Sequence, residues 1–250
     1  MSPSHLLTQT EHRPAPLAPR PWVMRQTWER LLFMHWPVSP AVLRERVPAP
    51  LEVETFEGAA WVGVVPFRMA GVRPRSLPAV RGFSTFPELN VRTYVRHRNR
   101  RAVYFFSLDA ASRLAVRVAR RLFHLPYFDA DMAVEEAGEA TRYRSVRTHR
   151  GAPAARFAAR YRPTGPVFRS ALGTLEHWLT ERYALLTTDD RGRPLLGEIH
   201  HPPWPLQPAE AEVETNTMAE AAGIRLPDAP PLLHYAERIE MLAWAPVRLP

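Results

Sequence analysis

Many short strand-like segments, separated by proline- and glycine-rich breaks, constrain the fold of this 250-residue chain more than any other feature. Residues 59–69 (AAWVGVVPFRM) are apolar except for Arg68, and residues 86–95 (FPELNVRTYV) alternate in side-chain type. Short runs of this kind, bounded by turn residues, are typical of β-strands. Because strand patterns outnumber helical ones, we expect an α+β fold built on a large antiparallel sheet. A sheet with so many strands tends to curl or close, which removes its exposed edges.

The individual elements can be predicted from periodicity and from turn residues. The expected helices cover residues 22–30, 41–46, 110–124 and 173–182, with a short one between 216 and 223. The expected strands cover residues 31–36, 51–56, 59–69, 86–95, 102–108, 127–135, 141–148, 154–162, 184–188, 195–200, 210–215 and 232–244. Two hairpins are predicted, one joining 51–56 to 59–69 and one joining 86–95 to 102–108.

The helix expected at residues 110–124 has two distinct stripes. Leu114, Val118 and Leu122 recur at four-residue spacing and form an apolar stripe, and the arginines at 113, 117 and 121 form a basic one. Solvent exposure explains the basic stripe without a ligand. Asp109 stands just before this helix and is its expected N-cap.

Residues 1–21 are polar and rich in proline, so we expect a disordered arm followed by a single domain over residues 22–250. The arm lacks the continuous apolar stretch of a secretory signal. No run of 18 or more apolar residues occurs, so we expect no transmembrane helix and no membrane partner. Without cysteine there is no disulfide, and the cytoplasm is the default location.

The net charge of +8 raises the question of a nucleic-acid partner, because basic patches bind phosphates. The arginines are scattered and no recognition motif accompanies them, so we expect a solvated basic surface rather than nucleic-acid binding. His200 and His201 would face opposite sides of a strand, and no metal site is expected. No cofactor motif is present, so no cofactor is expected; the sequence leaves a homo-oligomer open.

The segment 86–95 carries polar residues on one strand face. Phe86, Glu88, Asn90, Arg92 and Tyr94 would share that face, because side chains alternate along a strand. Alternation alone favours a solvent-facing strand. The other interpretation is that this face lines a wet interior.

Six motifs in fixed order connect the chain to a known family. They are His35-Trp36-Pro37 and residues 42–53 (VLRERVPAPLEV), 60–67 (AWVGVVPF), 86–95 (FPELNVRTYV), 103–110 (VYFFSLDA) and 121–127 (RLFHLPY). In this order the chain resembles the YqjF-like family, a widespread bacterial family of unknown function, over roughly residues 25 to 245. That family resembles acetoacetate decarboxylase more distantly.

This resemblance implies an acetoacetate decarboxylase-like fold, in which the antiparallel sheet closes into a cone-shaped barrel with a few peripheral helices. It also implies that Glu88 lines the cavity, which reverses the solvent-facing interpretation. The lysine pair of the decarboxylase corresponds to Tyr127-Phe128, directly after Pro126. The decarboxylase's substrate-binding arginine falls near Pro37.

The chain contains no lysine, since all 33 of its basic residues are arginine. Imine formation needs a nucleophilic amine, whereas a guanidinium stays protonated. The phenol of Tyr127 cannot form an imine, and the N-terminal amine lies on the expected arm. Lysine-imine decarboxylation is therefore excluded, although the fold can persist without it.

We therefore expect a cavity that binds a small organic ligand, an anionic one if arginines take part. Its expected binding residues are Arg68, Asn90, Arg92 and Tyr104. The alternative is an acid–base enzyme of the lyase or isomerase type, without a covalent intermediate, that uses Glu88 and Tyr127. An arginine partner would make Glu88 a fixed acceptor; without one, burial raises its pKa and makes it a candidate general base. The sequence does not decide whether the chain is an enzyme.

Overall fold

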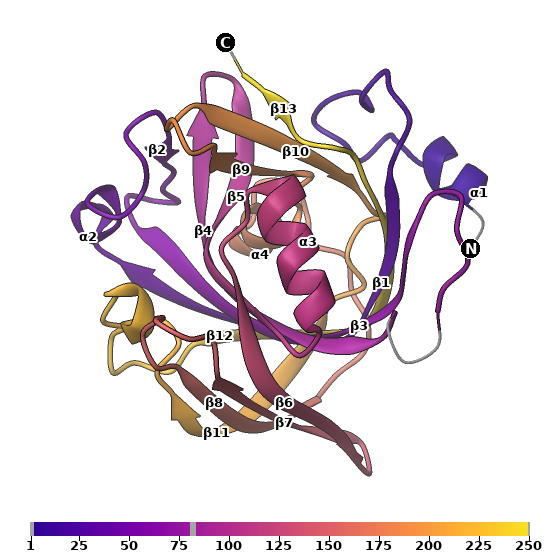
Figure 1. Cartoon of the computed structure of the whole chain (residues 1–250). Coiled ribbons are helices and arrows are strands. Elements are labelled where there is room, and N and C mark those ends of the chain that lie inside the picture. The colour runs from indigo at the N-terminus through magenta and orange to yellow at the C-terminus, as the bar shows by residue number, and fades with distance from the viewer. Residues whose placement is uncertain (1–2, 81–83, 250) are drawn as a thin grey trace.

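The structure, a computed structural model, describes residues 3–80 and 84–249, and it consists mainly of one large sheet (Figure 1). The strands are β1 (Met24–Val38), β2 (Glu52–Val53), β3 (Ala60–Pro74), β4 (Phe86–His97), β5 (Arg100–Ala110), β6 (Tyr127–Ala137), β7 (Ala140–Arg147), β8 (Arg156–Pro163), β9 (Ala184–Thr188), β10 (Pro194–His200), β11 (Gln207–Asn216), β12 (Leu232–Ala243) and β13 (Val247–Arg248). The helices are α1 (Pro3–Thr8), α2 (Pro40–Arg44), α3 (Arg113–Phe123), α4 (Leu175–Thr180) and the 3-10 turn η1 (Glu220–Ala222).

Hydrogen bonds between strands close this sheet into rings. The larger ring runs through nine strands, in the order β5, β6, β7, β8, β11, β12, β1, β3 and β4, and β4 pairs again with β5. A smaller ring shares β12, β1, β3, β4 and β5 with it and closes through β9 and β10. The pairings of β5 with β6 and with β9 are parallel, so the sheet is mixed rather than wholly antiparallel as expected.

Strand β4 is central because both of its faces are buried. Leu89 and Val91 pack in one apolar core, which also contains Tyr143 and Phe157. Phe86 packs in a second core on the opposite face. The predicted hairpin of β4 with β5 is confirmed, from Glu88 opposite Ala110 to His97 opposite Arg100.

Two local predictions at the start of the chain are wrong. Residues 22–30 form no helix, because β1 begins at Met24 and pairs with β12 and β3 on its two edges. Pairing on both edges outweighs the weak helical propensity of a short segment. The predicted hairpin of residues 51–56 with 59–69 is reduced to a single bridge, Phe56 with Ala59, and β2 pairs with β4 instead.

The third helix also differs from its prediction. Ser112, not Asp109, is the N-cap, and its hydroxyl accepts from the Ala115 backbone N–H. The apolar stripe of Leu114, Val118 and Leu122 is exposed, whereas Val116 is the buried residue of α3. On its inner side α3 packs on the second core through Val116, with Ala115, Ala119 and Phe123 beside it.

Residues 3–21, part of the arm that we expected to be disordered, lie against the sheet. Leu6 is fully buried and packs with Leu242 and Trp244. The Arg13 guanidinium donates to the Ile199 carbonyl oxygen at 2.9 Å.

Among the described helices, none is long and apolar enough to cross a bilayer.

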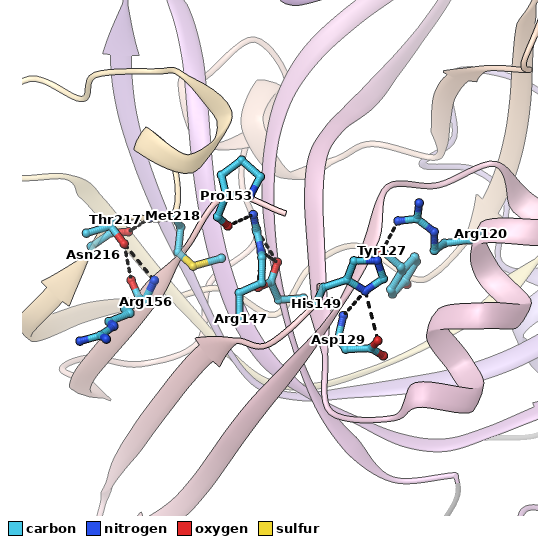
Figure 2. Close-up of polar contacts among 11 residues, drawn as sticks. Arg120, Tyr127, Asp129, Arg147, His149, Pro153, Arg156, Asn216, Thr217 and Met218 are labelled. Carbon is cyan, nitrogen blue, oxygen red and sulfur yellow. Dashed lines mark hydrogen bonds and ion pairs between the residues drawn. The ribbon is translucent and has the colours of Figure 1, made fainter. Parts of the chain in front are cut away.

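A buried ion pair occupies the position of the expected cap. Both carboxylate oxygens of Asp109 accept from Arg147, at 2.7–3.2 Å, and the two side chains are 0% and 3% exposed. Arg147 also reaches the Pro153 carbonyl oxygen at 3.3 Å (Figure 2). The pair thereby joins β5 to β7.

Replacing Arg147 with Met should lower the free energy of unfolding by about 3–5 kcal/mol, because Asp109 would remain as a buried carboxylate without its countercharge. Chemical denaturation measures the loss. The control is Arg96→Met, whose pair with Glu52 is 54% and 58% exposed and should contribute about 1 kcal/mol or less. Equal losses in the two variants would contradict this account of the buried pair.

Candidate functional site

A cavity of about 650 Å³ lies within the smaller strand ring. Residues from all strands of this ring line it, and α3 and Thr180 of α4 also border it. Figure 1 looks toward this ring, with α3 across its opening. The exposed lining residues lie on α3 and in residues 73–80, which marks the mouth.

The polar face of β4 forms one wall of the cavity. Phe86, Glu88, Asn90 and Arg92 all line it, and each is less than 10% exposed. The two-residue period of the strand therefore places these four residues on one face, whereas Tyr94, the fifth residue expected there, is fully buried and is not among the lining residues. The face is not solvated, although alternation alone favoured solvent, because the ring of strands encloses it.

Glu88 is the buried acid of this wall, with 2% of its surface exposed. Its carboxylate oxygen Oε2 accepts from the Tyr127 hydroxyl at 2.9 Å, and its backbone carbonyl oxygen accepts from Tyr143 at 2.7 Å. Burial raises the pKa of Glu88 to about 8, the hydrogen bond from Tyr127 opposes this, and the charge of Asp109 adds to it. At neutral pH Glu88 is therefore mainly protonated.

Tyr127 is held from two directions. Its side chain is 8% exposed, and burial, followed by the negative charge of Glu88, raises its pKa well above the usual value. Its backbone carbonyl oxygen accepts from Arg120 of α3 at 2.7 Å (Figure 2). Glu88 and Tyr127 therefore form a buried acid–phenol pair, and among the described ion pairs none gives Glu88 an arginine partner.

Arg92 is the buried cation of the same wall. It is 9% exposed, and its guanidinium lies over the rings of Phe33 and Tyr94, at 5.0 and 5.9 Å from their centroids. No ion pair among the described residues includes Arg92, and its Nε has no hydrogen-bond partner there. A guanidinium in this position needs an anionic partner to offset its desolvation.

A second guanidinium lies close to Arg92. Arg182 also lines the cavity, donates to Glu54, and stacks on the Tyr94 and Trp178 rings at 4.8 and 4.5 Å. Its Nη2 has no partner among the described residues. Glu54 also accepts from Arg101, so this one buried carboxylate is shared by two guanidinium groups.

Nearby His35 adds no further positive charge. Its Nε2 lies 2.7 Å from the Tyr94 hydroxyl, and burial, followed by the charges of Arg92 and His234, lowers its pKa well below the usual value. His35 is thus neutral at physiological pH. This part of the cavity is positively charged, and Asn90 adds a buried Oδ1 without a partner among the described residues.

The structure brings together four of the six predicted site residues. Arg68 and Tyr104 are not among the lining residues: Arg68 pairs with Glu29 at 2.7 Å, and the Tyr104 ring packs edge-on against Phe106 at 5.3 Å. Sequence reasoning missed Arg182 and Trp204, which also line the cavity. Arg182 follows a short helix, and Trp204 lies in a proline-rich segment. Neither lies in a strand, so no two-residue period predicts which way its side chain points.

The family comparison gives a match over residues 25–240 with DUF2071, an uncharacterized conserved protein family. The chain is 49% identical over 223 residues to the uncharacterized protein YqjF of Bacillus subtilis (strain 168), which covers 89% of this chain and 91% of that protein. The predicted YqjF-like resemblance is thereby confirmed.

Solved structures identify the fold. Acetoacetate decarboxylase from Legionella pneumophila aligns with a TM-score of 0.60 and 14% identity, over 98% of this chain and 95% of that chain. The enduracididine biosynthesis enzyme MppR, complexed with pyruvate, aligns with a TM-score of 0.58 and 12% identity, over 95% of this chain and 93% of that chain. At such identities the similarity establishes the fold alone, and the predicted acetoacetate decarboxylase-like fold is confirmed.

The raised pKa of Glu88 predicts a specific pH dependence of stability. The folded state keeps a proton that the unfolded state releases between pH about 4.5 and 8. The stabilisation is complete below about 4.5 and is lost as the pH rises to about 8, by about 1.4 kcal/mol per pH unit. Glu88→Gln should therefore gain stability relative to the wild type across this window.

Denaturant unfolding at several pH values measures this difference. The control is Glu45→Gln, whose parent side chain is 79% exposed and which should follow the wild type. If Glu88→Gln also follows the wild type at every pH, Glu88 does not hold a proton in the folded state.

Proposed function

The chain belongs to the DUF2071 family of uncharacterized conserved proteins, and we propose that it binds a small organic anion in the cavity. The observation that carries this proposal is Arg92, a buried guanidinium in the cavity wall without a carboxylate partner among the described residues. An uncompensated buried charge is strongly destabilising, whereas a bound carboxylate would pair with it in a favourable geometry. The cavity volume is also that of a small-molecule site, for which about 300–1,000 Å³ is usual.

The rest of the cavity favours a ligand with an apolar body. The rings of Trp28 and Trp204 stack at 5.8 Å, and Phe67 meets Trp28 edge-on at 5.7 Å. Glu88 and Arg92 are four residues apart, about 13 Å along an extended strand. An organic acid with its anionic end at Arg92 would extend along the apolar wall toward Glu88.

The fold neighbour MppR offers limited support, because it was observed with pyruvate, which is an organic acid. We carry over the class of ligand, not the molecule. Pyruvate has only three carbons and would leave most of the apolar wall without a contact.

A second candidate function is acid–base catalysis without a covalent intermediate, and the Glu88–Tyr127 pair favours it. A carboxyl group with a pKa of about 8 can donate a proton at neutral pH and accept one when it is ionised. The Tyr127 hydroxyl, 2.9 Å from Oε2, orients the group. A proton adjacent to a carbonyl group of the bound acid is the kind that such a pair can move.

Replacement of Arg92 should change the affinity for organic acids and the free energy of unfolding in different directions. Arg92→Met should weaken the binding of organic acids at least tenfold, because about 1.5–3 kcal/mol is typical of a charge-assisted hydrogen bond. Without ligand, the same variant should be at least as stable as the wild type, because it removes a buried charge. Displacement of the fluorescent aromatic sulfonate anilinonaphthalene sulfonate by a panel of fatty and aromatic carboxylates measures affinity.

The matched control is Arg96→Met on the same strand, since Arg96 is exposed and paired with Glu52. It should bind as the wild type does. If Arg92→Met and the wild type bind organic acids with equal affinity, Arg92 does not form an anion site and the proposal is wrong.

Catalysis can be tested by hydrogen–deuterium exchange of protons next to a carbonyl group, followed by NMR on the same panel of acids. If Glu88 is the base, exchange should increase as the pH rises toward about 8 and then level off. Glu88→Gln should abolish exchange while it keeps the affinity for the acid. An unchanged exchange rate in Glu88→Gln would exclude Glu88 from the chemistry.

A further inference from the structure

Exposed apolar side chains surround the mouth of the cavity. The exposed fractions are 58% for Leu77, 54% for Val80, 58% for Leu114, 39% for Val118 and 62% for Leu122. These are five of the nine large hydrophobic residues that are exposed in the described part of the chain, so exposure is concentrated here. All except Leu122 also line the cavity.

The same region is strongly basic. Helix α3 contains four arginines and no acidic residue, and residues 70–80 contain Arg73 and Arg75 and no acidic residue. Arg113, Arg117 and Arg121 are exposed, and no ion pair among the described residues includes them. We call the five apolar residues and these three arginines together the mouth surface.

The mouth surface has a fixed geometry because α3 is anchored. The arginines precede the three apolar residues of α3 by one position each, so a basic stripe runs beside an apolar stripe along the helix. Val116 packs into the core on the other side of α3, and Arg120 donates to the Tyr127 carbonyl oxygen (Figure 2). Both exposed stripes therefore face outward at the entrance of an apolar cavity.

We propose that the mouth surface docks on an anionic phospholipid membrane, so that apolar organic acids pass between the bilayer and the cavity. An amphipathic helix with arginines beside exposed leucines lies in the membrane interface, with its apolar side chains among the acyl chains. The arginines bind the anionic headgroups. Docking depends on the mouth surface alone, whereas ligand transfer also rests on the proposed function.

Two other occupants fit the mouth surface less well. A second copy of the chain placed on it by two-fold symmetry would bring arginine stripes together, and like charges repel. A nucleic acid would use the arginines but leave the leucines in water. The sequence-based expectation of no membrane partner considered only spanning segments, and an interfacial helix needs none.

Vesicle sedimentation tests the proposal directly. The protein should sediment with vesicles of phosphatidylcholine and phosphatidylglycerol in equal parts, should sediment poorly with phosphatidylcholine alone, and should be released by salt. Leu114→Ser with Leu122→Ser should weaken sedimentation at least tenfold. Arg113→Gln, Arg117→Gln and Arg121→Gln together should do the same, and this variant keeps the test valid if the serine variant does not fold.

The matched controls are Leu172→Ser, an 87% exposed leucine outside the mouth surface, and Arg142→Gln on β7. Both should sediment as the wild type does. Sedimentation that is equal in all variants, or that does not require the anionic lipid, would overturn the proposal. So would a stable dimer that the leucine variant dissociates. Because no carboxylate is added, failure here leaves the anion site of the cavity intact.

Discussion

Strand β4 is hydrogen-bonded on both edges and buried on both faces, and the rest of the site depends on this constraint. Its pairing with β3 and β5 completes both strand rings. Its apolar positions fill one core, so its alternate positions must point into the cavity. Glu88, Asn90 and Arg92 are therefore held in the interior, shielded from bulk solvent, where burial favours the protonated form of an acid and a cation requires a partner.

Arg92 and Glu88 give the cavity two chemically distinct parts. At Arg92 the wall carries a cation without a carboxylate partner among the described residues, and Arg182, which is paired with Glu54, lies over the same Tyr94 ring. At Glu88 the wall carries a neutral acid bonded to Tyr127. Tyr127 follows Pro126 at the position that the resemblance assigns to a lysine of acetoacetate decarboxylase. The fold is thus similar to that of the decarboxylase, whereas a lysine amine that could form the imine is absent from this chain.

The sequence was sufficient to predict most strands and the side of β4 that carries Glu88, because the two-residue period determines side-chain direction. It was not sufficient where tertiary pairing outweighs local preference, as in residues 22–30, or where exposure depends on what a helix covers, as with Leu114. The alternation of polar and apolar residues could not predict whether this face of β4 is exposed to solvent. A strand that faces solvent and a strand that lines a polar cavity show the same alternation. Arg182 and Trp204 reach the cavity through long-range packing that no local pattern records.

The central claim is that Arg92 holds the anionic end of an organic ligand. Native mass spectrometry of the protein as purified from cells, followed by extraction and identification of the bound molecule, tests it most directly. The account predicts an organic acid of several carbons bound to the wild type and to Arg96→Met but missing from Arg92→Met. A neutral molecule retained equally by all three proteins would contradict it.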